Sequence, residues 1–577
     1  MLASTFPTKY LLVNPGDTIS SVIQKMGRSA SQFIEMCFII DNSSFLLGVL
    51  NHADIIRALA DGVDLKEQVS TIMITDFISA SYGLPEEDII IDVRLKLFKK
   101  SGGSKELTRF VPLLDDGDKL CDVIDIFSLL SNNPTQGCHI DIYGLGFVGL
   151  TLGVTLASRG HYITGIDTNL NLISQLSAGQ PHVFEPRLKD MLINTLETGH
   201  FKVQVSTPDH HSKVVIITVG TPVDSESVPS LDALFSVCNA VGPKLKQGDL
   251  VMLRSTVPVG TTRSQVIPLL ESLSHLRAGK DFHVAFTPER TVEGQAMSEL
   301  TSLPQIVGGF SSQCASKASA FWQTLSNTVL VESLEAAELV KLINNSYRDL
   351  SFSFANGFAL LADQFNLDAF KVIAAANEGY PRNPIPQPSP GVGGYCLTKD
   401  PFLYSSIDNS APHSLLSQCG RHVNKLASDY PLLVLNRFLT SLGLQYDSLS
   451  VLVAGLAFKG LPETNDLRGS IGIDLCEQLL ALGVKVSVFD AVVSQSQLPS
   501  HFPKLVKYDG SLLDIDALLI LNNHPDNVPD NLLTLLQSSK TKLIFDGWSM
   551  LDRIDVENVP NLIYSSMGYC SSINSSC

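Results

Sequence analysis

The stretch HIDIYGLGFVGLTLGVTLASRGHYITGIDTN, residues 139–169, decides the fold of this chain. An apolar strand pattern runs into Gly144-x-Gly146-x-x-Gly149, and an apolar helical pattern follows at once. In such a strand–turn–helix unit the first glycine permits the tight turn, the second lets the backbone approach a pyrophosphate, and the third allows close helix–strand packing. The helix N-terminus faces the anion. The stretch therefore predicts a dinucleotide site at Gly144, Gly146, Phe147, Val148 and Gly149.

The next strand ends at Asp167, 18 residues after Gly149. A carboxylate at this place hydrogen-bonds the ribose 2′-hydroxyl and repels a 2′-phosphate. No arginine follows in Asp167-Thr168-Asn169-Leu170, so the sequence favours NAD over NADP. A glycine-rich turn of some other α/β fold is the alternative, and the acid at the end of the second strand weighs against it.

The pattern around this unit predicts an α/β protein with two Rossmann-like doubly wound units joined by a helical middle domain. Strand and helix patterns alternate over residues 136–325. Residues 326–442 have a helical period, interrupted by the Pro/Gly-rich loop NEGYPRNPIPQPSPGVGGYC. A second α/β unit, 443–577, opens at LSVLVAGLAFKG.

Residues 1–135 contain a weak internal repeat with a register of about 70 residues. Each copy predicts helix, strand, Asp-rich turn, strand and helix, with Asp41 and Asp115 at matching turns. The arrangement resembles a tandem pair of cystathionine-β-synthase (CBS) modules, an α/β CBS-domain pair ahead of the other units. Two unrelated α/β fragments remain the alternative.

The bulk composition limits the partners and the compartment. The 577 residues carry a net charge of -17, which argues against nucleic acid or an anionic membrane as partner. Ten scattered cysteines, with no CxxC pair and no metal-like Cys/His spacing, suit a reducing compartment and no metal site. No signal peptide or membrane span is visible, so we expect a cytoplasmic protein.

Seven ordered motifs, counting the glycine turn, resemble the UDP-glucose/GDP-mannose dehydrogenase family from about Cys138 almost to the C-terminus. The other six are TVGTPVD (218–224), RSTVPVGTT (254–262), TPERTVEG (287–294), EAAELVKLINNSYRD (335–349), PGVGGYCLTKDP (390–401) and GLAFKGLPETNDLRGS (455–470). The resemblance implies NAD-dependent, four-electron oxidation of a nucleotide-sugar alcohol to the acid.

The motifs carry residues whose chemistry suits that reaction. A thiolate can retain the intermediate aldehyde as a thiohemiacetal and then as a thioester, which water hydrolyses. Lys341 and Asn345 lie four apart on one helical face, so both can point at one oxyanion. By resemblance the catalytic set is the nucleophile Cys396, the acid/base group Asp400, Lys341, Asn345, the paired glutamates Glu289 and Glu293, and Thr256. Glu293 is the candidate for activating the hydrolytic water.

The resemblance also assigns ligand contacts. Thr221, Thr256, Lys399 and Arg468 are expected on the cofactor side. Glu289, Lys341, Asn345, Gly393, Lys459 and Arg382 are expected on the substrate side, with Arg382 offered by a neighbouring subunit. The cations among these residues, Arg382, Lys399, Lys459 and Arg468, could form a basic pocket that attracts a diphosphate despite the acidic exterior. Taken singly, each residue could equally be an ordinary surface side chain.

The stretch PERTVEGQAMSELTSLPQIVGG resembles the branch that acts on UDP-N-acetylhexosamines, and UDP-glucose or GDP-mannose is the alternative. The chain departs from the branch at Tyr395, where histidine is usual, at Gly357, where glutamate is common, and at Gly469 and Ile471. Two other hypotheses are a two-electron dehydrogenase of the 6-phosphogluconate kind and a catalytically silent nucleotide sensor. The first lacks a GGxCxxxDP loop, and the second is disfavoured because every catalytic position is filled.

Regulation and assembly are further expectations. CBS pairs often hold a ribose with an aspartate at the start of a module's final helix, matched here by Asp54 and, in the second copy, by Asp125. Asn51 stands where Ser or Thr is usual, which leaves the ligand open beyond an adenine nucleotide. A structural or dimerising appendage is the alternative. Because the helical middle is long and apolar, we expect a homodimer or a higher even oligomer.

Overall fold

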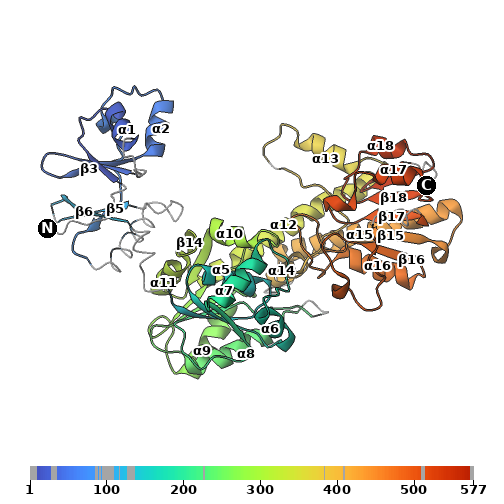
Figure 1. Cartoon of the computed structure of the whole chain (residues 1–577), viewed down its shortest axis with the longest axis horizontal. Coiled ribbons are helices and arrows are strands. Elements are labelled where there is room, and N and C mark those ends of the chain that lie inside the picture. Colours follow the sequence, from blue (N-terminus) through green and yellow to red (C-terminus); the bar gives the residue numbers. More distant parts are fainter. Residues whose placement is uncertain are drawn as a thin grey trace. The chain divides into compact units, whose positions relative to one another are not determined.

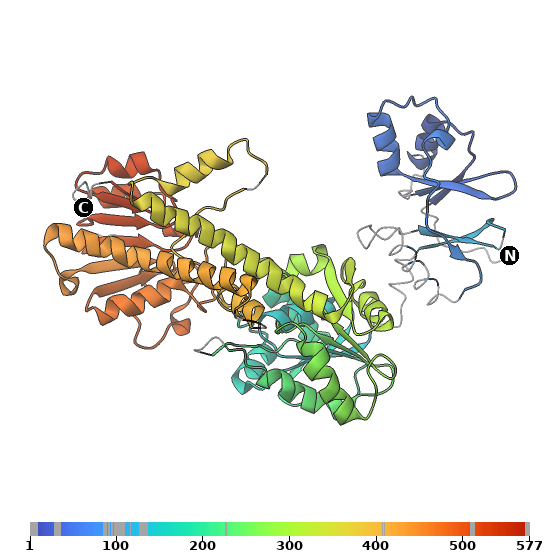
Figure 2. The same ribbon diagram turned by 180° about the vertical axis from the view of Figure 1, so that it is seen from behind.

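The computed structural model (Figures 1 and 2) describes residues 10–27, 36–84, 89, 93, 96, 110–115, 117–125, 137–224, 228–382, 384–406, 408, 410–507 and 514–571. The chain forms two compact units, Met1–Gln136 with Ser319–Leu330, and Gly137–Ala318 with Val331–Cys577. Within the described ranges, every helix is too short or too polar to cross a bilayer.

The first unit contains two small sheets built on one plan. The elements of the first half are β1 (Tyr10–Val13), α1 (Ile19–Gly27), β2 (Met36–Ile40), β3 (Leu46–Asn51), α2 (His52–Ala60) and a 3-10 turn (Val69–Thr71). Those described in the second half are β4 (Ala80–Ser81), β5 (Phe110–Leu114) and β6 (Leu120–Asp125). In each sheet the first pair of strands is parallel and the second pair is antiparallel.

The two matching turns have the same hydrogen bonds. Asp41 Oδ1 accepts from the backbone N–H groups of Ser43 and Phe45, and Asp115 Oδ1 accepts from those of Gly117 and Lys119. The expected matching turns are therefore present. The helices expected over 86–98 and after residue 125 lie largely outside the described residues.

The second unit opens with the sheet that carries the glycine turn. Its parallel strands have the order β12-β11-β10-β7-β8-β9, and β13 joins β12 antiparallel. The elements are β7 (His139–Tyr143), α5 (Phe147–Ser158), β8 (Tyr162–Ile166), α6 (Leu170–Ser177), α7 (Leu188–Glu197), β9 (Phe201–Gln204), β10 (Val214–Ile217), α8 (Asp232–Val241), β11 (Leu250–Leu253), a π-helical turn (Thr262–Val266), α9 (Ile267–Ser274), β12 (His283–Phe286), α10 (Ala296–Ser302) and β13 (Gln305–Gly309). The boundary between the units falls within the next two elements, α11 (Ser312–Trp322) and β14 (Thr328–Val331), because Ser319–Leu330 belongs to the first unit. The central strands are fully buried, as parallel strands covered on both faces require.

The helical middle consists of α12 (Leu334–Asp363), α13 (Ala369–Asn377), α14 (Tyr395–Ser405) and α15 (Pro412–Leu442). The long helices α12 and α15 run side by side in both views (Figures 1 and 2). A bidentate ion pair joins them, with Arg437 Nη1 and Nη2 both 2.7 Å from the Asp363 oxygens. Ser333 caps the start of α12 by accepting from the Ala336 N–H.

A second, mostly parallel sheet completes the unit, with the order β16-β15-β17-β18-β19-β20. Its elements are β15 (Ser450–Ala454), α16 (Ile471–Ala481), β16 (Lys485–Phe489), β17 (Ala517–Ile520), α17 (Leu532–Gln537), β18 (Leu543–Asp546), α18 (Arg553–Glu557), β19 (Ile563–Ser566) and β20 (Tyr569–Cys570). Helix α15 packs on this sheet, where the rings of Tyr430 and Phe545 lie 6.1 Å apart. The predicted pair of Rossmann-like sheets with a helical middle is confirmed.

Candidate active site

The glycine turn between β7 and α5 has room for a ligand at the expected position. Gly144 has φ +91°, and a Cβ on Gly149 would lie 1.9 Å from the Gly144 carbonyl oxygen, so both places require glycine. A Cβ on Gly146 would meet nothing within 4 Å. This open approach to the N-terminus of α5 fits a bound pyrophosphate.

Asp167 follows β8 and faces the same turn. Its Oδ2 accepts from the Leu145 N–H at 2.8 Å, and its Oδ1 accepts from the Asn169 N–H at 2.9 Å. The carboxylate is partly exposed, so lone pairs remain for a ribose hydroxyl. On the neighbouring loops, the buried Thr221 donates to the Thr256 carbonyl oxygen at 2.5 Å.

Cys396, the predicted nucleophile, lines a cavity of about 390 Å³ at the junction of the glycine turn, α12, α14 and the second sheet. The cavity is lined by residues that include Phe147, Val148, Glu289, Glu293, Lys341, Asn345, Gly393, Cys396, Phe458 and Lys459. Cys396 is the second residue of α14 and is exposed to the cavity. The positive end of the helix dipole therefore favours a thiolate or oxyanion here.

Gly393 and Gly394 bring this loop against the second sheet. A Cβ on Gly393 would lie 2.5 Å from the Gly469 carbonyl oxygen. Gly394 has φ +87°, and a Cβ there would lie 2.7 Å from the Phe458 ring. The two glycines therefore permit a close approach that places Cys396 between the two sheets.

Lys341 and Asn345 line the same cavity as Cys396, and Asp400 lies one turn later on α14. Protein atoms crowded around Cys396 raise the pKa of its thiol, and the charge of Lys341 acts in the opposite direction. Asn345 Nδ2 donates to Asp400 Oδ2 at 2.5 Å, and Lys399 Nζ lies 2.8 Å from Asp400 Oδ1. Asp400 and Lys399 thus form a buried ion pair beside the nucleophile, with Lys399 turned toward Asp400.

Glu289 is held as an anion by a buried arginine. Arg254 donates to Glu289 Oε2 from Nε at 2.9 Å and from Nη2 at 2.6 Å, and Oε1 accepts from the Arg290 and Thr291 N–H groups. Burial raises the pKa of Glu289, but the charges of Arg254 and Lys341 outweigh it and lower the pKa to about 2. Both oxygens are engaged, so Glu289 fits a positioning role better than proton transfer.

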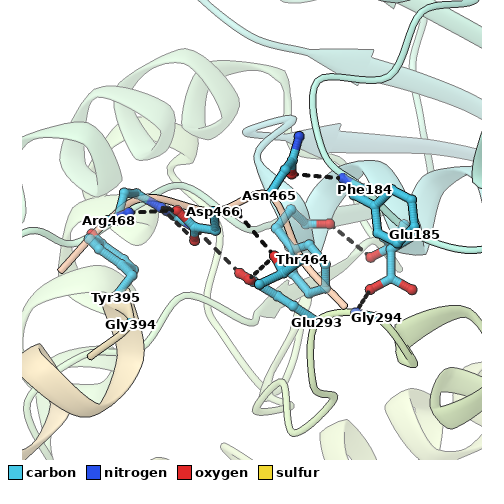
Figure 3. Close-up of polar contacts among 12 residues, drawn as sticks. Phe184, Glu185, Glu293, Gly294, Gly394, Tyr395, Thr464, Asn465, Asp466 and Arg468 are labelled. Carbon is cyan, nitrogen blue, oxygen red and sulfur yellow. Dashed lines mark hydrogen bonds and ion pairs between the residues drawn. The ribbon is translucent and has the colours of Figure 1, made fainter. Parts of the chain in front are cut away.

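Glu293 has the opposite properties. Figure 3 shows its carboxylate facing the segment Thr464–Arg468, where it accepts from Thr464 Oγ1 at 3.2 Å and from Arg468 Nη2 at 3.4 Å. Burial and the nearby Asp466 carboxylate raise the pKa of Glu293 to about 7. A carboxylate with this pKa can take a proton from water near neutral pH.

Arg468 lies beside the expected cofactor path. It lines a cavity of about 450 Å³ together with Gly146 and Phe147. Its guanidinium carbon lies 4.6 Å from the centre of the Tyr395 ring (Figure 3). Tyr395, which stands where histidine is usual, therefore contacts the cation that we expect on the cofactor side. Lys459 Nζ donates to the Glu293 carbonyl oxygen at 2.7 Å and thereby ties the second sheet to the Glu293 loop.

Three predicted site residues lie elsewhere. Arg382 is exposed, with its guanidinium over the Tyr380 ring, and it does not line the Cys396 cavity in the described part of the chain. Asp54 belongs to the first unit, where it forms a capping box with Asn51 at the start of α2. Asp125 is the last residue of β6, its side chain is not described, and the helix expected after it lies outside the described residues.

Two structural side chains near the site, one guanidinium and one carboxylate, were not predicted from the sequence. Arg254 lies within the motif RSTVPVGTT but was not singled out, and it is 2 % exposed. Its place directly after an apolar strand was the signal that could have predicted its burial. Glu185 accepts from the N–H groups of Gly294 and Ala296 and so fixes the loop beside Glu293 (Figure 3). Glu185 comes from a loop without a motif, so only the fold reveals it.

Comparisons with known proteins agree with this geometry. Models of the UDP-glucose/GDP-mannose dehydrogenase family match in three parts, the NAD binding domain (138–326), the central domain (335–425) and the UDP binding domain (452–553). The chain is 32% identical to UDP-N-acetyl-D-mannosamine dehydrogenase of Pyrococcus horikoshii over 72% of this chain and 96% of that protein. It is 30% identical to NDP-N-acetyl-D-galactosaminuronic acid dehydrogenase of Ralstonia nicotianae, over 67% and 90%. A solved structure of the UDP-D-ManNAc dehydrogenase from Pyrococcus horikoshii is similar with TM-score 0.67 and 30% identity, over 74% of this chain and 99% of that one.

Proposed function

Because this chain belongs to the UDP-glucose/GDP-mannose dehydrogenase family, whose members are NAD-dependent nucleotide-sugar dehydrogenases, we propose that it oxidises the C6 primary alcohol of a nucleotide sugar to the uronic acid with Cys396 as nucleophile. The observation that carries the proposal is one cavity that contains Cys396, Lys341, Asn345 and Glu293 beside the glycine turn. The family's NAD binding domain supports NAD as cofactor.

The first half of the reaction uses Cys396 and the groups around it. NAD, when bound, accepts one hydride in each of the two oxidations. As the first hydride leaves C6, the alcohol proton passes to a base, and the aldehyde stays in the cavity. The thiolate of Cys396 adds to the aldehyde carbon, and the oxygen becomes an oxyanion. Lys341 and Asn345 can stabilise this oxyanion, since both line the cavity from α12.

The second half uses Glu293. Loss of the second hydride from the thiohemiacetal carbon leaves a thioester on Cys396. Water then attacks the thioester carbonyl carbon, Glu293 takes the proton from that water, and the C–S bond breaks to give the acid and the free thiolate. The raised pKa of Glu293, about 7, suits a base that works near neutral pH.

We propose a UDP-N-acetylhexosamine as substrate. The similar proteins named UDP-N-acetyl-D-mannosamine and NDP-N-acetyl-D-galactosaminuronic acid dehydrogenases support this class. The test offers UDP-N-acetylglucosamine, UDP-N-acetylmannosamine, UDP-glucose and GDP-mannose separately and measures NADH per mole of acid. We expect two NADH per acid with one N-acetylhexosamine nucleotide and little free aldehyde. A ratio of one rules out the thioester route, and preference for UDP-glucose or GDP-mannose rules out the substrate assignment.

An even oligomer completes the proposal. Helix α12 exposes a row of large apolar side chains, between 47% and 72% exposed: Ile343, Tyr347, Phe354, Leu361 and, just beyond its end, Phe365. Exposed apolar patches of this kind mark interaction surfaces. Arg382, which is exposed in the single chain, would then reach a neighbour's substrate. Light scattering during turnover tests this, because an active monomer contradicts both the interface and the shared site.

We further propose that the first unit is a CBS-like pair that senses an adenine nucleotide. Its repeated sheets support the pair, since the turns at Asp41 and Asp115 face each other through hydrogen bonds between Leu46 and Asp118 and between Leu120 and Ser44. Apolar side chains of both sheets, among them Phe38 and Phe110, share one core. A ligand between two such halves could shift activity only by binding one state of the enzyme better.

A further inference from the structure

A buried polar network joins α12 and α15 behind the loop that carries Cys396. Helix α12 supplies Asp349 and Asn356, and α15 supplies Arg421 and Asn424; we call these four residues the loop clamp. Asp349 and Asn356 are 0% exposed, and Asn424 is 1% exposed. None of the four is among the described residues that line the Cys396 cavity, so the clamp lies behind the site.

Arg421 donates hydrogen bonds to the loop on both sides of Cys396. Its Nη1 donates to the Leu397 carbonyl oxygen at 3.0 Å, and its Nη2 donates to the Val392 carbonyl oxygen at 3.4 Å. Leu397 directly follows Cys396, and Val392 precedes the two glycines of the loop. The planar guanidinium therefore fixes the start and the end of the turn with one rigid group.

The rest of the clamp orients Arg421 and anchors the start of the loop. Asp349 Oδ1 accepts from Arg421 Nη1 and from Asn424 Nδ2, at 2.7 and 2.8 Å. Asn356 donates to Asn424 Oδ1 at 3.0 Å and accepts from the Ser389 N–H at 2.8 Å. The contacts form one continuous chain from Ser389 to Leu397.

We propose that Arg421 is a positioning residue for the nucleophile, which holds the Cys396 thiol at its reactive place beside Lys341 without touching the substrate. The proposal rests on the proposed role of Cys396. A misplacement of about 1 Å at a reacting centre can lower a rate about 100-fold, so the fixing of this loop has a measurable consequence.

The energetics indicate that the clamp serves geometry more than stability. Burial raises the pKa of Asp349 to about 6, and the charge of Arg421 acts against that rise. Asp349 Oδ2 is buried without a hydrogen-bond partner in the described part of the chain. A buried ion pair with an unsatisfied oxygen is often no more stable than well-packed apolar residues. The pair does orient the Arg421 N–H groups toward the Val392 and Leu397 carbonyl oxygens of the loop.

The same two helices offer a matched control. Arg437 of α15 makes a bidentate ion pair with Asp363 of α12, and Asp363 also accepts from the Tyr430 hydroxyl. This pair links the helices as Arg421–Asp349 does, but it contacts neither Val392 nor Leu397. Arg437→Gln should therefore disturb the helix pairing without moving the nucleophile.

The experiment compares Arg421→Gln, Arg421→Lys, the double variant Asp349→Asn/Arg421→Gln and Arg437→Gln in the full-length enzyme. The double variant avoids an unpaired buried charge and guards against misfolding. Steady-state kinetics and thermal midpoints are measured together with iodoacetamide labelling of Cys396 across pH. Mass spectrometry follows the labelled peptide, and the exposed Cys419 of α15 serves as internal reference.

We expect both Gln-containing variants at position 421 to lower kcat about 100-fold while KM for the nucleotide sugar changes less than about threefold. The pH profile of Cys396 labelling should move to higher pH as the thiol leaves Lys341, while Cys419 labelling stays constant. Arg421→Lys should recover little, because one ammonium cannot serve both carbonyl groups. Arg437→Gln should leave kcat and Cys396 labelling unchanged.

Unchanged Cys396 labelling in folded Arg421→Gln overturns the proposal. Equal losses of kcat in Arg421→Gln and Arg437→Gln at equal thermal midpoints also overturn it, since the effect would then belong to helix packing. A shifted labelling profile with unchanged kcat supports the clamp and instead contradicts Cys396 as nucleophile.

Discussion

The two Rossmann-like sheets begin with similar glycine turns that the chain uses differently. Gly144 and Gly455 have φ +91° and +97°, and added Cβ atoms would meet Val219 and Asn522 at 2.8 and 2.7 Å. An aspartate after the next strand holds each turn. Asp167 Oδ2 accepts from the Leu145 N–H, and Asp490 Oδ2 accepts from the N–H groups of Leu456 and Ala457. The sheet, the turn and the acid are thus repeated.

The two turns differ in the segment that joins each of them to its helix. After Gly144 the helix starts at Phe147, whereas after Gly455 it starts only at Ile471. Ala457 replaces the second glycine, and the inserted segment carries Lys459, Thr464 and Arg468 toward the Glu293 loop. One turn offers a helix N-terminus to a pyrophosphate, and the other offers side chains to the site between the sheets. We therefore expect the same fold to supply two kinds of nucleotide contact.

The largest expected effect separates binding by the two sheets from chemistry between them. Cys396→Ala should lower acid formation by a factor on the order of 10⁴ to 10⁶, because Cys396 is the only cysteine among the described residues that line the cavity. NAD and the nucleotide sugar should still bind, since both turns are intact. Calorimetry for each ligand and acid production check this. Cys419→Ala, at another exposed cysteine, is the control. Acid formation near the wild-type rate would reveal another nucleophile.

The second prediction concerns Glu293, which is contacted by the segment that follows the glycine turn of the second sheet. Glu293→Gln should slow turnover about 10² to 10⁴-fold by blocking thioester hydrolysis. The two oxidations should still give a burst of two NADH per active site. In the wild type, the base must be ionised, so hydrolysis should increase as pH rises through about 7 and level off above it. Stopped-flow absorbance measures burst and plateau. Full turnover without a burst in Glu293→Gln would place the base elsewhere.

The third prediction tests the paired aspartates directly. Asp167→Ala should weaken NAD binding by about 1.5–3 kcal/mol and lessen discrimination against NADP, through loss of charge-assisted hydrogen bonds to ribose. Asp490→Ala, its matched partner, should leave both cofactor constants unchanged and affect only stability and the nucleotide sugar. KM for NAD and NADP is measured in both variants. If the two variants behave alike toward NAD, the division of labour between the sheets is wrong.

Local patterns in the sequence predicted the sheets because each strand, turn and helix is encoded in consecutive residues. Gly144, Gly149 and Gly455 are required by close backbone approaches within their own turns. The motifs likewise brought Cys396, Lys341 and Asn345 to one cavity. Spacing placed Lys341 and Asn345 on one helical face, whereas the place of Cys396 beside them was implied by the family resemblance.

Partnerships between distant segments were not predictable in this way. Glu289 belonged to the predicted catalytic set by resemblance, and the sequence did not show that Arg254, 35 positions earlier, donates to its Oε2. Arg421 lies 24 positions from Leu397 and carries no motif. Asp54 matched a ligand position by its place in the first turn of a helix, but the capping box with Asn51 accounts for the same placement. A side chain's task depends on contacts that sequence spacing does not show.

The smallest expected effect asks whether nucleotide binding is confined to the two sheets. A ligand bound to the first unit would reveal a third nucleotide site, so nucleotide binding would no longer be confined to the two Rossmann-like sheets. Asp54→Ala in the full-length enzyme should remove any response to ATP, ADP or AMP while leaving kcat and KM without nucleotide within about twofold. The response itself should be about 5- to 150-fold, the usual range for coupling between sites. Because the capping box contributes about 1 kcal/mol to α2, Asp54→Asn, which keeps an oxygen for the Asn51 N–H, separates the loss of a cap from the loss of a ligand. Calorimetry with each nucleotide, in the presence of saturating NADH and UDP to fill the two sheets, reports the third site alone. No heat from any adenine nucleotide, with kinetics indifferent to all three, would make the first unit a structural appendage.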